Sequence, residues 1–153
     1  MIKIRRAAID DLKSVQHLND LLFKHDGQFD ETVCTGWTYG DSGENYFRSM
    51  IENEFVWVAE NEADVIGYLA GSYKNKELYS NETYAELNDM YVLEEFRKQG
   101  AGKLLFDKFN SECKRKGIKA IRVTASAKNS GAINFYKKNG FDEFDIILRK
   151  RIK

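Results

Sequence analysis

The sequence predicts a single domain of mixed α+β class over residues 1–153. A chain of 153 residues has the usual size of one domain, and 42% of its residues are hydrophobic, which is enough for one core. Segments rich in β-branched and aromatic residues alternate with segments of helical periodicity, and no proline or repeat marks a linker. We therefore expect an antiparallel front half, followed by strand–helix–strand–helix–strand.

The front half predicts a strand, a helix, a long loop, a second helix and a hairpin. Acidic residues at positions 10 and 11 can cap the first helix, and the loop is rich in glycine and acidic residues. Loops of this length in compact domains are often functional. The predicted elements are a strand over Ile2–Ala7, a helix from Asp10 to about Lys24, a loop over 26–43, a helix over Glu44–Asn53, and hairpin strands over Phe55–Glu60 and Val65–Tyr73.

The back half alternates strands with two helices. The first of these helices has an apolar face and a glycine stop at Gly117, and Asn129 can cap the second. The predicted elements are a strand over Tyr84–Leu93, a helix over Gly100–Lys116, a strand over Ile118–Ala125, a short helix from Asn129 to Gly140, and a last strand over Phe141–Leu148.

Charge is divided unevenly along the chain. Residues 1–89 carry 17 acidic and 8 basic side chains, a net of −9, whereas residues 90–153 carry 7 acidic and 16 basic ones, a net of +9. The basic half could face an anionic ligand and the acidic half a cationic one, or both could be solvated faces without a ligand. Because the basic residues are not clustered with aromatic ones, a nucleic-acid partner is not expected.

The chain also lacks the signals of a membrane or secreted protein. It has no run of about 18 apolar residues, and Met1–Arg6 does not provide the apolar stretch of a secretion signal. Cys34 and Cys113 are far apart and have no histidine at ligand spacing, which favours reduced thiols. We therefore expect a cytoplasmic protein with no membrane partner and no bound metal.

A glycine-containing turn, Arg97–Lys103, leads from a predicted strand into a predicted helix. A phosphate at the start of a helix meets unpaired backbone N–H groups and the positive end of the helix dipole. Gly100 and Gly102 keep side chains away from such an anion, while Arg97 and Lys98 add positive charge. The turn predicts a phosphate cradle, although alone it also fits an ordinary strand-to-helix turn. Its spacing is neither that of a Walker A loop nor that of a dinucleotide fingerprint.

A second motif downstream of the turn makes the chain resemble the GNAT superfamily of N-acetyltransferases. The family motif R/Q-x-x-G-x-G/A is followed by N-x-x-A-x-x-F-Y-x-x-x-G-F, in the order seen here. The resemblance is strong over Tyr84–Phe141 and implies a central, mostly antiparallel twisted sheet of six to seven strands, flanked by about four helices and splayed in the middle for CoA. The matches are Arg97, Gly100 and Gly102 for the first motif, and Asn129, Ala132, Phe135, Tyr136, Gly140 and Phe141 for the second.

The resemblance implies acetyl-CoA as cosubstrate. Its pyrophosphate is expected on the turn, and its pantetheine arm is expected to pair like an added strand with the backbone of the preceding strand. The N–H of Val92 is expected to stabilise the thioester oxyanion, and Asn129 to bind the pantetheine arm. The expected cofactor-binding residues are Met90, Tyr91, Val92, Arg97, Lys98, Gln99, Gly100, Ala101, Gly102, Lys103, Asn129 and Tyr136.

The implied reaction is direct attack of a primary amine on the thioester, with Tyr136 as the proton donor to the thiolate; the alternative for Tyr136 is a core aromatic. Many relatives carry a glutamate where this chain has Asn88, and an amide cannot take the proton of the amine. Glu86, expected on the same strand face as Asn88, is the candidate base, and Asp89 is expected to point to the opposite face. Glu86 could equally be an exposed strand-end carboxylate without a role.

The long loop predicts an acceptor site for a cationic amine, because carboxylates and aromatic faces attract cations. The expected acceptor residues are Asp30, Glu31, Trp37 and Asn88. A polyamine, an aminoglycoside-like molecule or a lysine side chain of a protein or peptide would each fit. The alternative is a solvated loop whose aromatic residues pack into the core.

Two further possibilities follow from the resemblance. The chain could be a non-catalytic GNAT-like module that senses acyl-CoA or binds a partner protein. It could also form a homodimer, because dimers are common in the family and the predicted last strand, Phe141–Leu148, could pair across a two-fold axis.

Overall fold

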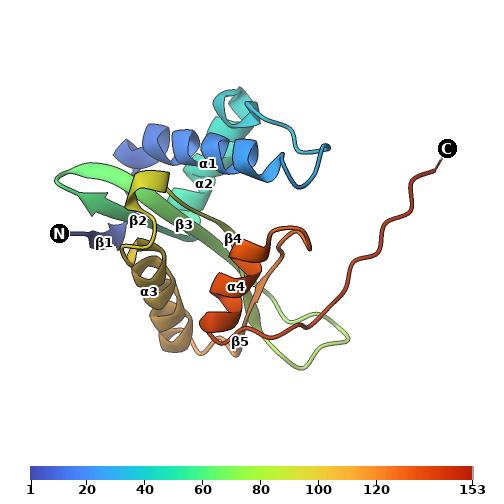
Figure 1. The fold of residues 1–153 in the computed structure, drawn as a ribbon. Coiled ribbons are helices and arrows are strands. Elements are labelled where there is room, and N and C mark those ends of the chain that lie inside the picture. Colours follow the sequence, from blue (N-terminus) through green and yellow to red (C-terminus); the bar gives the residue numbers. More distant parts are fainter. Residues whose placement is uncertain (153) are drawn as a thin grey trace.

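The computed structural model describes residues 1–152, which form one five-stranded sheet in the order β1-β2-β3-β4-β5. Neighbouring strands are antiparallel except β4 and β5, which are parallel. In Figure 1, α1 and α2 lie over one side of the sheet, and α3 and α4 lie on the other. The strands are β1 (Lys3–Arg6), β2 (Phe55–Asn61), β3 (Asp64–Lys74), β4 (Tyr84–Val92) and β5 (Ala120–Val123).

Four α-helices and three short 3-10 helices connect these strands. Helix α1 begins after Asp11, whose carboxylate accepts the Ala8 amide at 2.7 Å and is held by Arg5 of β1 at 2.6 Å. This link fixes the start of α1 against the sheet. The helices are η1 (Ile9–Asp11), α1 (Leu12–Asp26), η2 (Trp37–Tyr39), α2 (Asp41–Asn53), η3 (Glu94–Phe96), α3 (Ala101–Arg115) and α4 (Ser130–Lys138).

The sheet separates two apolar cores. Val15 and Phe47 belong to the core beneath α1 and α2, whereas Leu105 and Phe109 belong to the core beneath α3. Close packing on the α3 side requires Gly71 of β3, because a Cβ there would lie 2.6 Å from the ring of Phe109. The two helix layers are therefore fixed on opposite faces of the sheet, and β4 runs between them.

The predicted α+β class and element order are confirmed, with three differences. The sheet has five strands rather than six or seven, and Phe141–Leu148 is not a strand. That segment has strand-type residues, but a strand forms only against a neighbour, and it pairs with no strand in residues 1–152. The predicted loop over 26–43 is shorter than expected, because Trp37–Tyr39 forms a 3-10 turn and α2 starts at Asp41. No helix in residues 1–152 has the length and apolar character needed to cross a membrane.

Candidate active site

Strand β4 lies at the centre of the candidate site because its two halves are paired differently. Residues 84–87 pair with β3 on one side and with β5 on the other, and the last β5 pair joins Leu87 to Val123. Residues 88–92 continue to pair with β3 as far as Val92 but have no partner on β5 in residues 1–152. The sheet is thus splayed between β4 and β5, as the sequence predicts, and one backbone edge of β4 is open.

Three residues line this open edge, and their side chains pack into the two cores. Met90 and Val92 pack toward α3, whereas Tyr91 is buried beneath α1 and α2. The Leu93 amide bonds to a carbonyl of β3, and backbone groups alternate in direction along a strand, so those of Tyr91 face β3 as well. Because Arg97 occupies the Val92 carbonyl, the groups left for a ligand in the splay are the N–H and C=O of Met90 and the N–H of Val92. An extended, amide-rich chain could pair with such an edge as an additional strand does.

The turn after β4 enters the left-handed region of backbone conformation twice, at Lys98 (φ 60°) and at Gly100 (φ 89°). A Cβ at Gly100 would meet nothing within 4 Å, so glycine is needed there for its positive φ. The first bond of α3 runs from the Leu104 amide to the Gly100 carbonyl at 3.0 Å. The amides of residues 101–103 therefore lack an intrahelical acceptor and can receive an anion at the positive end of the helix dipole.

Arg97 braces this turn against β4. Its Nε donates to the Val92 carbonyl at 2.9 Å, and its guanidinium lies 5.0 Å from the ring centroid of Tyr91. One side of the guanidinium is thus used to hold the end of β4 in place. The residue predicted as a phosphate contact has a structural role as well.

The other side chains of the turn follow the surface. Gln99 donates from Nε2 to the Glu95 carbonyl at 2.8 Å, and Lys103 pairs with Asp107 one turn further along α3. Lys98 has no ion-pair partner within the described chain. Of the cationic side chains predicted for the cradle, Lys98 is therefore the one free to meet a phosphate without breaking another contact.

A bulge in β4 occurs where the pairing changes. Ala70 of β3 pairs with Asp89, and the next residue, Gly71, pairs with Leu87. Asn88 is the extra residue between these pairs, and its side chain is exposed. A bulge of this kind breaks the two-residue alternation of side chains along a strand.

The bulge brings two carboxylates to the same face. Leu87 lies in the core beneath α3, so its neighbour Glu86 faces the other side, toward α1 and α2. Asp89 lies opposite Ala70, which belongs to the core beneath α1 and α2, and directly opposed residues share a face. The expectation that Asp89 points away from Glu86 is therefore wrong, because it assumed a strict period of two through Asn88.

Asp89 is a recessed carboxylate, and within residues 1–152 it has no hydrogen-bond or ion-pair partner. Burial raises the pKa of Asp89 to about 7, and repulsion from Asp26 at the end of α1 adds to the increase. Burial also raises the pKa of Tyr46 in α2 to about 12 and that of Tyr136 above its usual range, with Asp89 the next contributor in each case. Asp26, Asp89, Tyr46 and Tyr136 therefore interact electrostatically across one region of the fold.

Glu86 has a different environment from Asp89. Its carboxylate lies 3.5 Å from the Nζ of Lys74 on β3, and its side chain is 36% exposed. An exposed ion pair of this kind has a small free energy. The predicted base thus has a cationic partner and solvent, whereas Asp89 has neither partner nor full solvation.

Helix α4 carries the two predicted residues of the downstream motif. Asn129 caps the helix, because its Oδ1 accepts the Ala132 amide at 3.0 Å. The ring of Tyr136 is half-buried between Phe135 and Phe141, with centroid distances of 5.5 and 5.4 Å. Tyr136 is thus held by aromatic packing against the core beneath α3.

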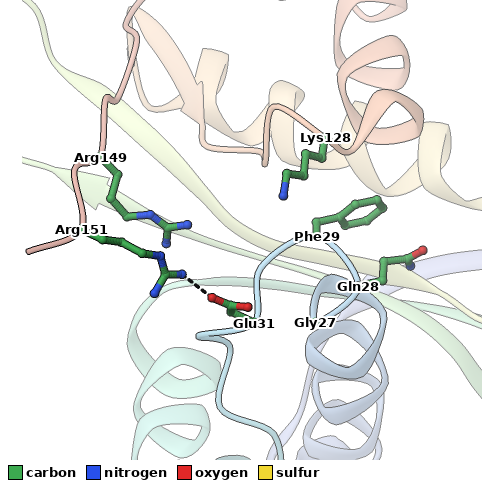
Figure 2. Close-up of a pocket in the computed structure, with 7 residues that line it drawn as sticks. All are labelled: Gly27, Gln28, Phe29, Glu31, Lys128, Arg149 and Arg151. Atoms are coloured by element: carbon green, nitrogen blue, oxygen red, sulfur yellow. Dashed lines mark hydrogen bonds and ion pairs between the residues drawn. The ribbon is translucent and has the colours of Figure 1, made fainter. Parts of the chain in front are cut away.

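The residues predicted for the acceptor site do not converge. Trp37 packs against Phe47 in the core beneath α1 and α2, with ring centroids 5.6 Å apart. Asp30 and Glu31 face the C-terminal segment, where Arg149 lies 3.5 Å from Asp30 and Arg151 binds Glu31. Figure 2 shows these arginines directed at the loop across a pocket of about 380 Å³.

Sequence reasoning missed Asp26, Tyr46 and Asp89 as members of the candidate site. Asp26 and Tyr46 lie on helices, and their sequence positions carry no motif. Asp89 was noticed but assigned to the wrong face, because nothing in the sequence announces the bulge at Asn88. One feature of the sequence could have indicated the role of Asp89. Asn88 stands where relatives often have a glutamate, and the next residue is itself a carboxylate.

Comparison with known proteins shows the family. The model of the acetyltransferase (GNAT) family matches residues 22–141. A spermidine N(1)-acetyltransferase of Thermoplasma acidophilum is 27% identical over 98% of this chain and 97% of that protein. An uncharacterized N-acetyltransferase of Chlorobaculum tepidum is 33% identical over 76% of this chain and 72% of that protein. A match to an uncharacterized N-acetyltransferase of Methanocaldococcus jannaschii, 26% identical, spans 67% of this chain but only 46% of that protein.

Solved structures share the fold at low sequence identity. A tetramutant of the BH1408 protein from Bacillus halodurans has a TM-score of 0.88 at 18% identity, covering 98% of this chain and 99% of that one. An aminoglycoside acetyltransferase from an uncultured soil sample, in complex with sisomicin, has a TM-score of 0.74 at 23% identity, covering 99% and 97%. The aminoglycoside N-acetyltransferase AAC(6′)-Iy in complex with CoA has a TM-score of 0.76 at 16% identity, covering 100% and 95%.

Proposed function

Because the chain belongs to the acetyltransferase (GNAT) family, whose members are acyl-CoA-dependent acetyltransferases, we propose that it transfers the acetyl group of acetyl-CoA to a primary amine of a small cationic molecule. One observation carries the acceptor class. In addition to burial, the charge of Asp26 raises the pKa of Asp89, and the charge of Asp89 raises the pKa of Tyr46 and of Tyr136 beside the open edge of β4. Asp89 has no cationic partner among the described residues, whereas Asp26 contacts His25 at 3.4 Å. An acidic region with an unpaired carboxylate favours a cation.

The residues present fit acetyl-CoA. The free amides of residues 101–103 and the side chain of Lys98 suit its pyrophosphate, and the open backbone edge at 90–92 suits its pantetheine arm. Asn129 uses its oxygen as a helix cap, which leaves its amide NH₂ free to donate to that arm. When bound, acetyl-CoA supplies an activated acetyl group as a thioester. The Val92 amide would donate to the thioester carbonyl oxygen.

The acceptor we favour is a polyamine or another molecule with at least two amino groups. Asp26 would attract the ammonium group that does not react, which leaves Asp89 for the reacting amine, and the Tyr46 ring nearby offers cation–π contact. The matched spermidine N(1)-acetyltransferase and aminoglycoside acetyltransferases are named for acceptors of this chemistry. Asp30 and Glu31 would then act at a distance, as part of an acidic surface. A lysine side chain of a protein remains the second acceptor to test.

Two carboxylates are candidates for the base that removes the proton of the ammonium group. Asp89 is favoured over Glu86, because a pKa of about 7 matches a base that works near neutral pH. Glu86, the residue indicated by the sequence, is 36% exposed and lies 3.5 Å from the Nζ of Lys74, so it is not desolvated as Asp89 is. A water molecule could link either carboxylate to the amine.

We assign the proton donor to Tyr136. Burial and the charges of Asp89 and Asp26 raise the pKa of its hydroxyl, so it stays protonated at neutral pH. Asp89 would take one proton from the ammonium group before attack. As the carbon–nitrogen bond forms and the carbon–sulfur bond breaks, the Tyr136 proton would go to the sulfur, and the second proton leaving the nitrogen would restore the Tyr136 hydroxyl, directly or through solvent.

The experiment is a thiol-release assay with acetyl-CoA and matched amines. 1,4-Diaminobutane and butylamine differ only in the second ammonium group, and spermidine, an aminoglycoside and an N-blocked lysine extend the series. We expect kcat/KM for 1,4-diaminobutane to exceed that for butylamine by about tenfold or more, roughly 1.4 kcal/mol of selective binding. Equal values for the pair would contradict a cation-selective site. Absence of turnover with every amine, in a protein that binds CoA, would overturn the proposed reaction.

A further inference from the structure

Asn19 of α1 and Tyr68 of β3 form a buried polar pair at the core beneath α1 and α2. Both side chains are fully buried, and the Nδ2 of Asn19 donates to the Tyr68 hydroxyl oxygen at 2.7 Å. Apolar side chains such as Val15 and Phe47 belong to the same core. Burial of polar groups among apolar ones is costly unless they make hydrogen bonds, so the pair is expected to have further partners.

The bond between these two side chains leaves other polar groups of the pair unused. Because the Tyr68 oxygen accepts from Asn19, the hydrogen of its hydroxyl has to be directed at a different acceptor. The Oδ1 of Asn19 is buried and has no hydrogen-bond partner within residues 1–152. Buried polar groups destabilise a fold when they stay unpaired, so we expect an acceptor for Tyr68 and a donor for Asn19 close by.

Asp89 is the acceptor that the register of the sheet places beside Tyr68. Tyr68 pairs with Tyr91 and Ala70 pairs with Asp89, so Tyr68 and Asp89 are diagonal neighbours on the face beneath α1 and α2. Diagonal neighbours lie within reach of an aromatic side chain, and Ala70, the residue opposite Asp89, carries only a methyl group. After burial, the charge of Asp89 is the largest contribution that raises the pKa of Tyr68, which agrees with this placement.

The other groups that face Asp89 supply no cation to it. Asp26 repels its charge, and the partly exposed Tyr46 hydroxyl is open to solvent, whereas the Tyr68 hydroxyl is not. A neutral O–H donor is therefore what the fold offers to a buried carboxylate at this place. The titratable and charged groups around Asp89 are Asp26 of α1, Tyr46 of α2, Tyr68 and Lys74 of β3, Glu86 and Tyr91 of β4, and Tyr136 of α4.

We propose that Asn19 and Tyr68 are positioning residues for the base of the reaction: Asn19 holds the Tyr68 hydroxyl so that its hydrogen is directed at the Asp89 carboxylate. The contact is direct or runs through one water molecule, which would accept from Tyr68 and donate to Asp89 and to the Oδ1 of Asn19. A hydrogen bond donated to a carboxylate favours its ionised form, so Tyr68 keeps Asp89 able to accept a proton despite its burial. This role rests on the proposed function, in which Asp89 takes a proton from the ammonium group.

The test compares the titration of Asp89 in wild type and in Tyr68→Phe, which removes the hydroxyl and keeps the ring. Without the donated hydrogen bond the ionised carboxylate is less stable, so the pKa of Asp89 should rise by about one unit, a tenfold change in proton affinity. Carbon-13 NMR of the Asp89 carboxyl group measures this pKa without any amine. Tyr73→Phe, an exposed tyrosine on the same strand, is the matched control and should leave the titration unchanged.

Asn19→Leu tests whether Asn19 acts through Tyr68, and it keeps the question answerable if Tyr68→Phe does not fold. The variant replaces the amide by an apolar side chain of similar size and leaves the Tyr68 hydroxyl free to rotate. The pKa of Asp89 should therefore rise, but by less than in Tyr68→Phe. Because both residues serve one hydrogen bond, the double variant should match Tyr68→Phe alone. Shifts that add in the double variant would overturn the role of Asn19.

The pH dependence of kcat/KM with 1,4-diaminobutane connects this contact to the reaction. Its midpoint in Tyr68→Phe should lie about one pH unit above that of wild type, in step with the titration. A Tyr68→Phe variant that loses stability but keeps both the titration and the midpoint would overturn the proposal, because Tyr68 would then serve packing alone. If no amine is acetylated while the titration shifts as expected, the proposed reaction fails and the contact between Tyr68 and Asp89 stands. If amines are acetylated and the titration does not shift, the contact fails and the reaction stands.

Discussion

Strand β4 consists of two halves that do different work. Residues 84–87 are paired on both edges and bury Ala85 and Leu87 beneath α3. Residues 89–92 are paired with β3 only, and they hold the open backbone and Asp89. The bulge at Asn88 lies where the first half ends. A single extra residue thus accompanies both the loss of pairing and the change of side-chain face, and a strand paired on both edges becomes one with an open edge within nine residues.

The largest effect is expected from closing the cofactor end of this open half. Gly102→Glu puts bulk and negative charge among the free amides at the start of α3, where an anion is otherwise favoured. Because the new carboxylate would repel the pyrophosphate, we expect the affinity for CoA to fall by about 100-fold or more. Titration calorimetry measures this affinity. Gly102→Ala should fold normally, because a Cβ at this position lies 3.5 Å from the Phe135 ring, an ordinary contact. Ser111→Glu, exposed on the same helix, is the charge control, and equal affinities of Gly102→Glu and wild type would show that the cradle lies elsewhere.

The second effect concerns how the free energy of unfolding depends on pH, through Asp89 in the open half. Folding raises the pKa of Asp89 to about 7. Between about pH 4 and pH 7, Asp89 is therefore protonated in the folded chain but ionised in the unfolded chain. Ionisation of Asp89 therefore destabilises the fold as pH rises through that window. We expect the free energy of unfolding of Asp89→Asn at pH 8 to exceed that of wild type by up to about 4 kcal/mol, the value that corresponds to the raised pKa of Asp89.

Urea unfolding at pH 5 and pH 8 checks this prediction. The stability difference between Asp89→Asn and wild type should be larger at pH 8 than at pH 5. Glu86→Gln, in the fully paired half, should show no such growth. A difference that is independent of pH would mean that Asp89 is not desolvated as described.

The third effect separates proton donation from cofactor binding. Tyr136→Phe keeps the aromatic packing between Phe135 and Phe141 but removes the hydroxyl, so kcat should fall by about 100-fold while the affinity for CoA stays within about threefold. Tyr73→Phe, an exposed tyrosine on β3, should have wild-type kcat. Wild-type kcat in Tyr136→Phe would remove this residue as the acid.

The smallest effect is expected in the paired half. Glu86→Gln removes a carboxylate that is exposed and already paired with Lys74, and we expect kcat/KM to change by less than about threefold. Steady-state kinetics with the best diamine measures it. A loss comparable to that of Asp89→Asn would restore Glu86 as the base and break the contrast between the two halves.

The sequence could predict the parts of the site that are local. The turn at Gly100 and the start of α4 at Asn129 are contiguous motifs, and both lie where predicted. The parts that failed depend on tertiary pairing. The bulge at Asn88 follows from the register of β3 against β4, and the state of Phe144–Leu148 depends on whether a neighbouring edge exists. Trp37, predicted to meet the acceptor, is partly buried against the core beneath α1 and α2, and its contact with an acceptor stays a prediction.

We propose that Asp89, which the bulge brings to the face covered by α1 and α2, removes the proton of the amine. The most direct test is kcat/KM of wild type and Asp89→Asn with 1,4-diaminobutane, measured from pH 5.5 to 9. For wild type we predict a rise with pH whose midpoint lies near 7, the pKa of Asp89. For Asp89→Asn we predict a value about 100-fold lower at pH 8 and no rise centred near 7. A profile for Asp89→Asn that keeps both the wild-type midpoint and the wild-type magnitude would contradict the claim.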